Sequence, residues 1–100
     1  MTWKDELGEL FAGYVNQQTL EEGVDAMVFV SAGNAAYHRR FCKALEEGIA
    51  ACGRGDEEVL PLVNGSGYRV QTIREALDLL MEFRARYLER YDQAIGRAAQ

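Results

Sequence analysis

The chain of 100 residues is long enough for one domain with a single buried core, and its 48% hydrophobic content is typical of a folded globular protein. Its net charge of −5 disfavours phosphate-rich partners such as duplex DNA or a lipid surface. The longest nearly apolar run, residues 26–32, is too short to cross a membrane, and the charged N-terminus lacks the apolar stretch of a signal peptide. We therefore expect one helical domain, residues 1–100, located in the cytoplasm.

Three threonines, each followed three residues later by an acid, mark helix starts: Thr2/Asp5, Thr19/Glu22 and Thr72/Glu75. The threonine oxygen accepts a free backbone N–H at the start of a helix, and the acid suits the positive end of the helix dipole. Apolar residues at helical spacing follow each signal. These patterns predict helices at about residues 3–16, 20–31 and 73–98.

The end of the second helix carries an apolar residue on its polar side. Val24, Met27 and Val28 share one face, whereas Phe29 points elsewhere, so the helix either is buried on two sides or offers Phe29 to a partner. A strand over residues 27–30 is a rival interpretation, because short apolar runs do not distinguish a strand from a buried helix.

A third helix is expected over about residues 35–52, with Asn34 as its cap and Gly53 after its end. Cys42 and Cys52 then lie ten residues apart on this helix, which separates their Cα atoms by about 15 Å. A disulfide needs less than about 7 Å. We expect two reduced thiols, in agreement with a cytoplasmic location.

His38 lies on the shoulder of the apolar face of the third helix, beside Cys42. A tetrahedral metal site needs three or four ligands of this kind, and the chain has a single histidine and two cysteines. We therefore predict no metal and no cofactor, and interpret His38 as a partly buried histidine beside a core thiol.

Residues 57–70 are ambiguous between a short helix that ends at Gly65 and a small hairpin about the Asn-Gly turn. Pro61 disfavours both, since it removes a helix hydrogen bond and restricts a strand to the edge of a sheet. We favour the short helix, with Tyr68 and Val70 extended beneath the bundle. The two glycines of this segment lack the lysine that follows a phosphate-binding Walker loop, so we interpret them as a turn.

Together these patterns predict an all-α fold: a compact bundle of four main helices, at about residues 3–16, 20–31, 35–52 and 73–98, with a short helix or small hairpin around residues 57–70.

The last helix has a wide apolar stripe, as expected for a helix between two neighbours. Its centre is expected at Ile73, Leu77, Leu80, Met81, Leu88, Tyr91 and Ile95, with Phe83, Tyr87 and Ala94 along one side. Arg84 falls near the middle of this stripe, where an unpaired guanidinium is costly. We expect Arg84 either to extend its charge to solvent or pair with an acid of the first two helices, or to line a candidate pocket with Tyr37 and His38.

Acidic residues are concentrated in residues 1–30, whose net charge is −5, and in the run of three acids at residues 56–58. If the first two helices are antiparallel, these acids share one face that attracts a basic protein. The expected partner-binding residues are Glu6, Glu9, Glu21, Glu22, Asp25, Phe29, Asp56, Glu57 and Glu58.

No paired acids or Ser/His/Asp spacing indicates an enzyme. We expect a small acidic helical binding protein that inhibits a basic, nucleic-acid-handling protein by occluding its surface, without contacting nucleic acid or a membrane itself. In size and charge, although in no residue motif, the chain resembles bacterial immunity proteins that neutralise nuclease toxins and phage proteins that block nucleic-acid-handling defence complexes. The protein is expected to be a monomer or a homodimer.

The alternative is a structural or regulatory helical module that acts as a homodimer or as a subunit of a complex. In that case the last helix would complete the interface through Leu79, Phe83 and Tyr87.

Overall fold

The computed structural model describes residues 2–15, 19–65 and 67–98, and every regular element within these ranges is a helix. The chain forms α1 (Trp3–Leu10), the π-helical turn η1 (Phe11–Val15), α2 (Leu20–Ser31), α3 (Ala35–Gly53), α4 (Val59–Asn64) and α5 (Ile73–Ala98). The predicted all-α bundle is confirmed. The rival strand at residues 27–30 and the hairpin around residues 57–70 are wrong, because residues 27–30 lie within α2 and the second segment contains the short helix α4. Asn16, the expected end of the first helix, lies outside the described residues.

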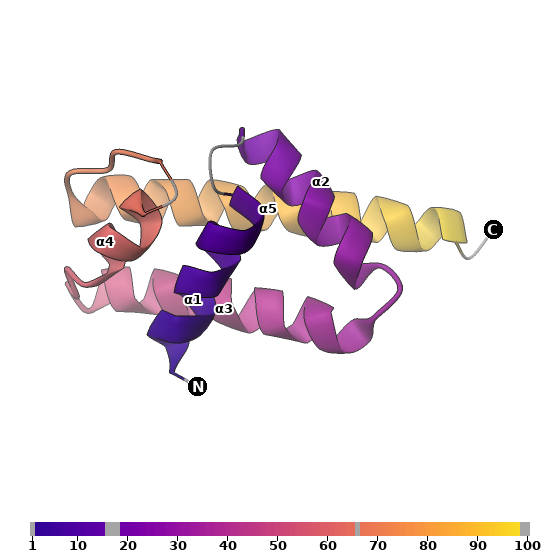
Figure 1. The fold of residues 1–100 in the computed structure, drawn as a ribbon, viewed down its shortest axis with the longest axis horizontal. Helices are drawn as coiled ribbons and strands as arrows, with labels where there is room; N and C mark the ends of the chain where they lie inside the picture. Colours follow the sequence, from indigo (N-terminus) through magenta and orange to yellow (C-terminus); the bar gives the residue numbers. More distant parts are fainter. Residues whose placement is uncertain (1, 16–18, 66, 99–100) are drawn as a thin grey trace.

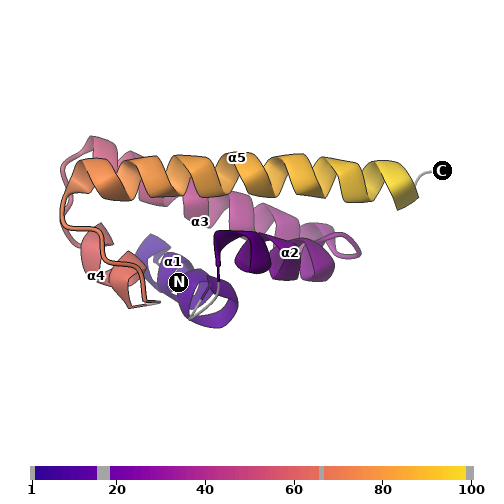
Figure 2. The same ribbon diagram turned by 90° about the horizontal axis from the view of Figure 1, so that it is seen from above.

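The helices form two layers in a molecule of 43 × 24 × 20 Å (Figure 1). The long helices α3 and α5 run antiparallel in one layer, and α1, α2 and α4 cover one face of that layer (Figure 2). The C-terminal end of α5 extends beyond the other helices. Across residues 2–15, 19–65 and 67–98, no helix has the length and apolar character needed to span a membrane.

The helix starts agree with the sequence signals. In each threonine pair, the hydroxyl oxygen accepts a hydrogen bond from the backbone N–H of the acid, at Thr2/Asp5, Thr19/Glu22 and Thr72/Glu75. In the first two pairs the carboxylate also accepts from the threonine N–H, which completes a capping box. Asn34 caps α3 by accepting from the N–H of Ala36 at 3.0 Å.

The loop between α4 and α5 is closed by the side chain of Asn64. Its amide donates to the carbonyl of Val70 at 2.9 Å, and its carbonyl accepts from the N–H of Val70 at 2.8 Å. Gly67 supplies the positive φ of 104° that the loop needs. Tyr68 is thereby held against Phe11, with a ring-to-ring distance of 6.3 Å, so this segment is a closed turn packed under the bundle.

The buried stripe of α5 is rotated relative to the expected one. Its centre consists of Ala76, Leu80, Phe83, Tyr87 and Tyr91, whereas Met81 is 54% exposed and Ile95 is 39% exposed. The rotation arises because α5 packs against both α2 and α3, so that its most buried line lies between these two contacts. The expected dimer contacts through Phe83 and Tyr87 are therefore wrong, since both side chains are fully buried within the chain.

Candidate functional site

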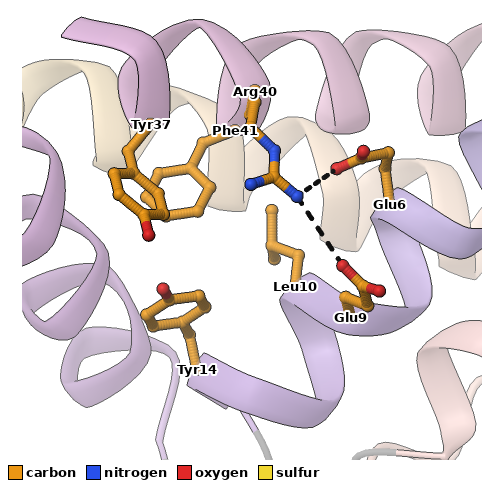
Figure 3. A pocket seen from close by; sticks show the side chains of 7 residues that line it. All are labelled: Glu6, Glu9, Leu10, Tyr14, Tyr37, Arg40 and Phe41. Carbon is orange, nitrogen blue, oxygen red and sulfur yellow. Dashed lines mark hydrogen bonds and ion pairs between the residues drawn. The ribbon is translucent and has the colours of Figure 1, made fainter. Parts of the chain in front are cut away.

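A surface pocket of about 170 Å³ lies where α1 and η1 meet the first half of α3 (Figure 3). Carboxylates, aromatic rings, one leucine and one arginine share its wall. The lining residues are Glu6, Glu9, Leu10, Tyr14, Tyr37, Arg40 and Phe41.

The elements that form the pocket follow from the sequence. Glu6 and Glu9 are three residues apart, so α1 presents both carboxylates on one side. The chain then widens into η1, and this π-helical turn separates the directions of Phe11 and Tyr14. Phe11 enters the core against Phe83 at 5.8 Å, while Tyr14 faces α3.

The aromatic side of the pocket is a connected group of rings. Tyr14 packs edge-on against Phe41 with centroids 5.2 Å apart, and Tyr37 lies 6.1 Å from Phe41. Figure 3 shows Tyr14 and Tyr37 facing each other across the opening, with their hydroxyls directed toward one another. Phe41 is buried, so it fixes the positions of the two more exposed tyrosines.

The polar side of the pocket is organised by Arg40. One guanidinium nitrogen lies 3.2 Å from Glu6 Oε2 and 3.7 Å from Glu9 Oε2, and the guanidinium carbon is 5.9 Å from the centre of the Tyr37 ring. Two carboxylates and one guanidinium leave the lining with a formal charge of −1. The pocket therefore favours a cationic group beside apolar ring surfaces.

Three of these residues are among the sequence-predicted sites: Glu6, Glu9 and Tyr37. Tyr14 was not predicted as a site residue, because its direction depends on the π-helical turn. Arg40 was not predicted as a pocket residue either, since its partners lie 34 and 31 positions away in the chain.

The other predicted acids do not join this site. At the contact between α2 and α5, Glu21 pairs with Arg86 and Arg90, and Asp25 pairs with Arg90. Because α1 lies over α3 while α2 crosses α5, the two acidic segments meet different arginines. The expected single acidic face is therefore not formed.

The remaining acids of that predicted set serve local roles or lie at the end of the bundle. Glu22 completes the cap of α2, and Asp56 accepts a hydrogen bond from the N–H of Glu58 at 3.0 Å. Glu58 pairs with Lys4, and Glu57 is exposed. Of the two alternatives for the end of α2, burial on two sides is wrong, since 87% of Phe29 is exposed.

His38 belongs to a buried polar chain on the other side of α3. The hydroxyl of Tyr87 donates to Ser31 Oγ at 2.8 Å, which leaves its oxygen to accept from His38 Nδ1 at 2.8 Å. The imidazole stacks on Tyr91 with ring centres 3.6 Å apart, and Cys42 Sγ lies 3.7 Å from Nε2. This chain joins α2, α3 and α5 through paired polar groups.

Burial sets the ionisation of this group. It lowers the pKa of His38, an effect that Asp92 opposes and Arg39 reinforces. It raises the pKa of Tyr87 to about 12 and also raises the pKa of the Cys42 thiol. A thiol held in its neutral form is a poor nucleophile, so the Cys42–His38 contact is a packing feature.

Arg84 pairs with Glu46 of α3 at 3.2 Å, so the expected partner in the first two helices is wrong. Residues Tyr37, His38 and Arg84 lie in three separate environments and do not form the expected common pocket. Arg84 lines a groove on the uncovered face of α3 and α5 together with Glu46, Ile49, Met81 and Ala85. Among the described residues, no three metal-binding side chains gather at one place.

Comparison with protein-family models, with curated proteins and with solved structures found no match to this chain.

Proposed function

We propose that this protein is a small acidic helical binding protein that docks on a basic protein and occludes the surface with which that partner handles nucleic acid. The pocket between α1 and α3 supports this proposal, because it combines two carboxylates with the rings of two partly exposed tyrosines. A basic side chain gains charge attraction and contact with ring faces there.

The size of the pocket favours a side chain over a metabolite. Its volume of about 170 Å³ is smaller than the roughly 300–1,000 Å³ of most small-molecule sites. The net charge of −5 adds long-range attraction toward a basic surface and repulsion from nucleic acid. In the complex, the carboxylates at the pocket then occupy the places on the partner's surface that would otherwise bind the phosphates of nucleic acid.

Phe29 is the second contact we assign to the partner. An aromatic side chain that is 87% exposed gains much by being covered, and aromatic residues are enriched at the centres of protein interfaces. Both cysteines are free thiols, which supports the proposed cytoplasmic location. An immunity protein of a toxin system and a phage anti-defence inhibitor are the two settings in which such a binder acts.

The proposal is tested with the partner isolated on the tagged protein and then purified. Glu6→Gln/Glu9→Gln should weaken the complex by about tenfold, and raising salt from 50 to 500 mM should weaken the wild-type complex. The matched control is Asp78→Asn/Glu89→Gln, which removes the same charge at exposed positions outside the pocket lining. Binding that ignores both salt and the pocket substitutions would contradict the proposal, as would a partner that still binds nucleic acid in the complex.

The second candidate function is a homodimeric structural or regulatory module, whose interface would use other residues than the expected Phe83 and Tyr87. The uncovered face of α3 and α5 carries a groove with the half-exposed Met81 beside Ile49 and Ala85. Light scattering of the wild type and of Met81→Glu tests it. A dimer mass that falls to the monomer mass in the variant would support this function, and a monomeric wild type would rule it out.

A further inference from the structure

We propose that the pocket between α1 and α3 binds the guanidinium of a partner's arginine, held by Glu6 and Glu9 and stacked beside Tyr14 and Tyr37. This inference rests on the proposed function and names the group that the site recognises. It is independent of whether the partner is a toxin or a defence protein.

The guanidinium of Arg40 shows which kind of group the carboxylates hold. It lies within 3.2 Å of Glu6 and 3.7 Å of Glu9, and near the face of the Tyr37 ring at 5.9 Å. These are the contacts of a planar cation with carboxylates and an aromatic surface. Arg40 thus occupies one edge of a site built for such a cation.

Arg40 does not fill the site. The pocket of about 170 Å³ remains open beside it, between Tyr14, Tyr37 and Phe41. Glu9 keeps 56% of its side chain exposed and shares only the longer contact with Arg40. A carboxylate has about four positions that accept hydrogen bonds, so Glu9 can accept from a second donor.

The charge of the lining requires a cation rather than an anion. Glu6 and Glu9 outnumber Arg40, which leaves one unit of negative charge. An anion would be attracted by Arg40 alone and repelled by both carboxylates. One additional monovalent cation makes the site neutral.

The aromatic wall favours an arginine over a lysine. A guanidinium is planar and weakly hydrated, so it stacks on ring faces and gives up its water at lower cost than an ammonium. Tyr14 and Tyr37 flank the opening with their rings, and their hydroxyl oxygens also accept hydrogen bonds from the N–H groups of a guanidinium.

The test uses the full chain, three blocked tripeptides and NMR chemical shifts. Gly-Arg-Gly should shift the backbone signals of Glu6, Glu9, Tyr14 and Tyr37 in a saturable manner. The peptide with citrulline in place of arginine is the same shape without the charge, and it should bind at least about tenfold more weakly. The lysine peptide should bind several-fold more weakly than the arginine peptide. Equal shifts from arginine and citrulline, or stronger binding of lysine, would overturn the assignment.

Arg40→Ala separates a cation site from an anion site. Removing Arg40 leaves both carboxylates free and enlarges the opening, so affinity for the arginine peptide should rise several-fold. Weaker binding in this variant would show that Arg40 itself holds the ligand, and would overturn the proposal. Glu6→Gln/Glu9→Gln should abolish the shifts, whereas Asp78→Asn/Glu89→Gln should retain them. Loss in both pairs would show binding to net charge alone.

These measurements need no protein partner, so the two proposals can fail separately. A partner that is lost with Glu6→Gln/Glu9→Gln, while the arginine peptide does not bind, keeps the proposed function and removes the arginine assignment. If the arginine peptide binds at the pocket but the partner binds equally well to Glu6→Gln/Glu9→Gln, the arginine assignment is kept and the proposed function is removed.

Discussion

Two consecutive residues of α3, Tyr37 and His38, lie on different sides of the helix and in different surroundings. Tyr37 faces an open pocket with Arg40, whereas His38 faces the core and ends a chain of hydrogen bonds through Tyr87 to Ser31. On the α5 side, the side chains of Ser31, Tyr87 and His38 are hydrogen-bonded to one another. On the α1 side, Arg40 neutralises only one of the two carboxylate charges of Glu6 and Glu9, and part of the Tyr37 ring remains exposed.

This difference separates the side of α3 that stabilises the fold from the side that we propose binds a partner. A buried polar group that loses its partner costs the full price of its desolvation, so the network beside His38 stabilises one arrangement of α2, α3 and α5. Groups in the pocket keep access to water, and they can exchange water for a ligand at little cost to the fold. Substitutions on the two sides should therefore give opposite patterns.

The largest expected effect on stability separates two tyrosines. Tyr87→Phe removes the hydroxyl that joins Ser31 and His38, leaves both without that partner, and should lower the free energy of unfolding by about 1–3 kcal/mol. Tyr37→Phe removes a hydroxyl at the pocket opening and should change it by less than about 0.5 kcal/mol. Urea denaturation of both variants measures the contrast. Equal losses would show that the two sides of α3 do not differ.

Gly48 of α3 lies in the core between α1 and α5. Its substitution should have the next largest effect on stability. A Cβ there would lie 3.0 Å from Leu7 Cδ2 of α1 and 3.2 Å from Leu80 Cδ1 of α5. Overpacking costs about 1–3 kcal/mol, and the better helix propensity of alanine returns at most about 1 kcal/mol. We expect Gly48→Ala to lower the melting temperature.

Gly53 is the matched control on the same helix, because a Cβ there meets nothing within 4 Å among the described residues. Gly53→Ala should be neutral or stabilising by up to about 1 kcal/mol. A Gly48→Ala variant as stable as Gly53→Ala would mean that α1 and α5 can move apart around α3.

Local sequence signals predicted the elements well. Thr2, Thr19 and Asn34 each cap a helix within one turn of the chain, so neighbouring residues alone determine where α1, α2 and α3 begin. The apolar period also placed most of the core. Its error on α5, the rotation of the buried stripe toward Phe83 and Tyr87, arose because a helix with two packed neighbours buries the line between them.

The candidate site was only partly predictable, because it depends on contacts between distant residues. Glu6 and Glu9 were expected to bind a partner, and Tyr37 to line a pocket, but nothing local connects α1 with α3. Arg40 was missed because its ion pair with Glu6 spans 34 positions. The same limitation made the acids of α2 look free, although Arg86 and Arg90 meet them across the bundle.

The smallest expected effect is a pH dependence of stability through His38. Its pKa in the folded protein is lowered from 6.5, because burial disfavours the charged ring; Arg39 acts in the same direction and Asp92 opposes it. Below pH 6.5 His38 becomes protonated in the unfolded chain but stays neutral in the folded chain. The free energy of unfolding therefore falls as the pH decreases from 6.5 toward the lowered pKa. Above pH 6.5 the imidazole is neutral in both states, and the stability that comes from burying the neutral ring is fully present.

Comparison with His38→Gln isolates the contribution of the imidazole, because the two proteins differ at this position alone. Urea denaturation at pH 7.5 and 5.5 should show a steeper loss in the wild type than in the variant, whatever their absolute stabilities. Tyr37, one residue earlier, is the internal reference: Tyr37→Phe should keep the wild-type slope, because it leaves the imidazole and its partners in place. A wild type that gains stability relative to His38→Gln on acidification would mean that Asp92 outweighs burial, and that the α5 side of α3 is open to water as the pocket side is.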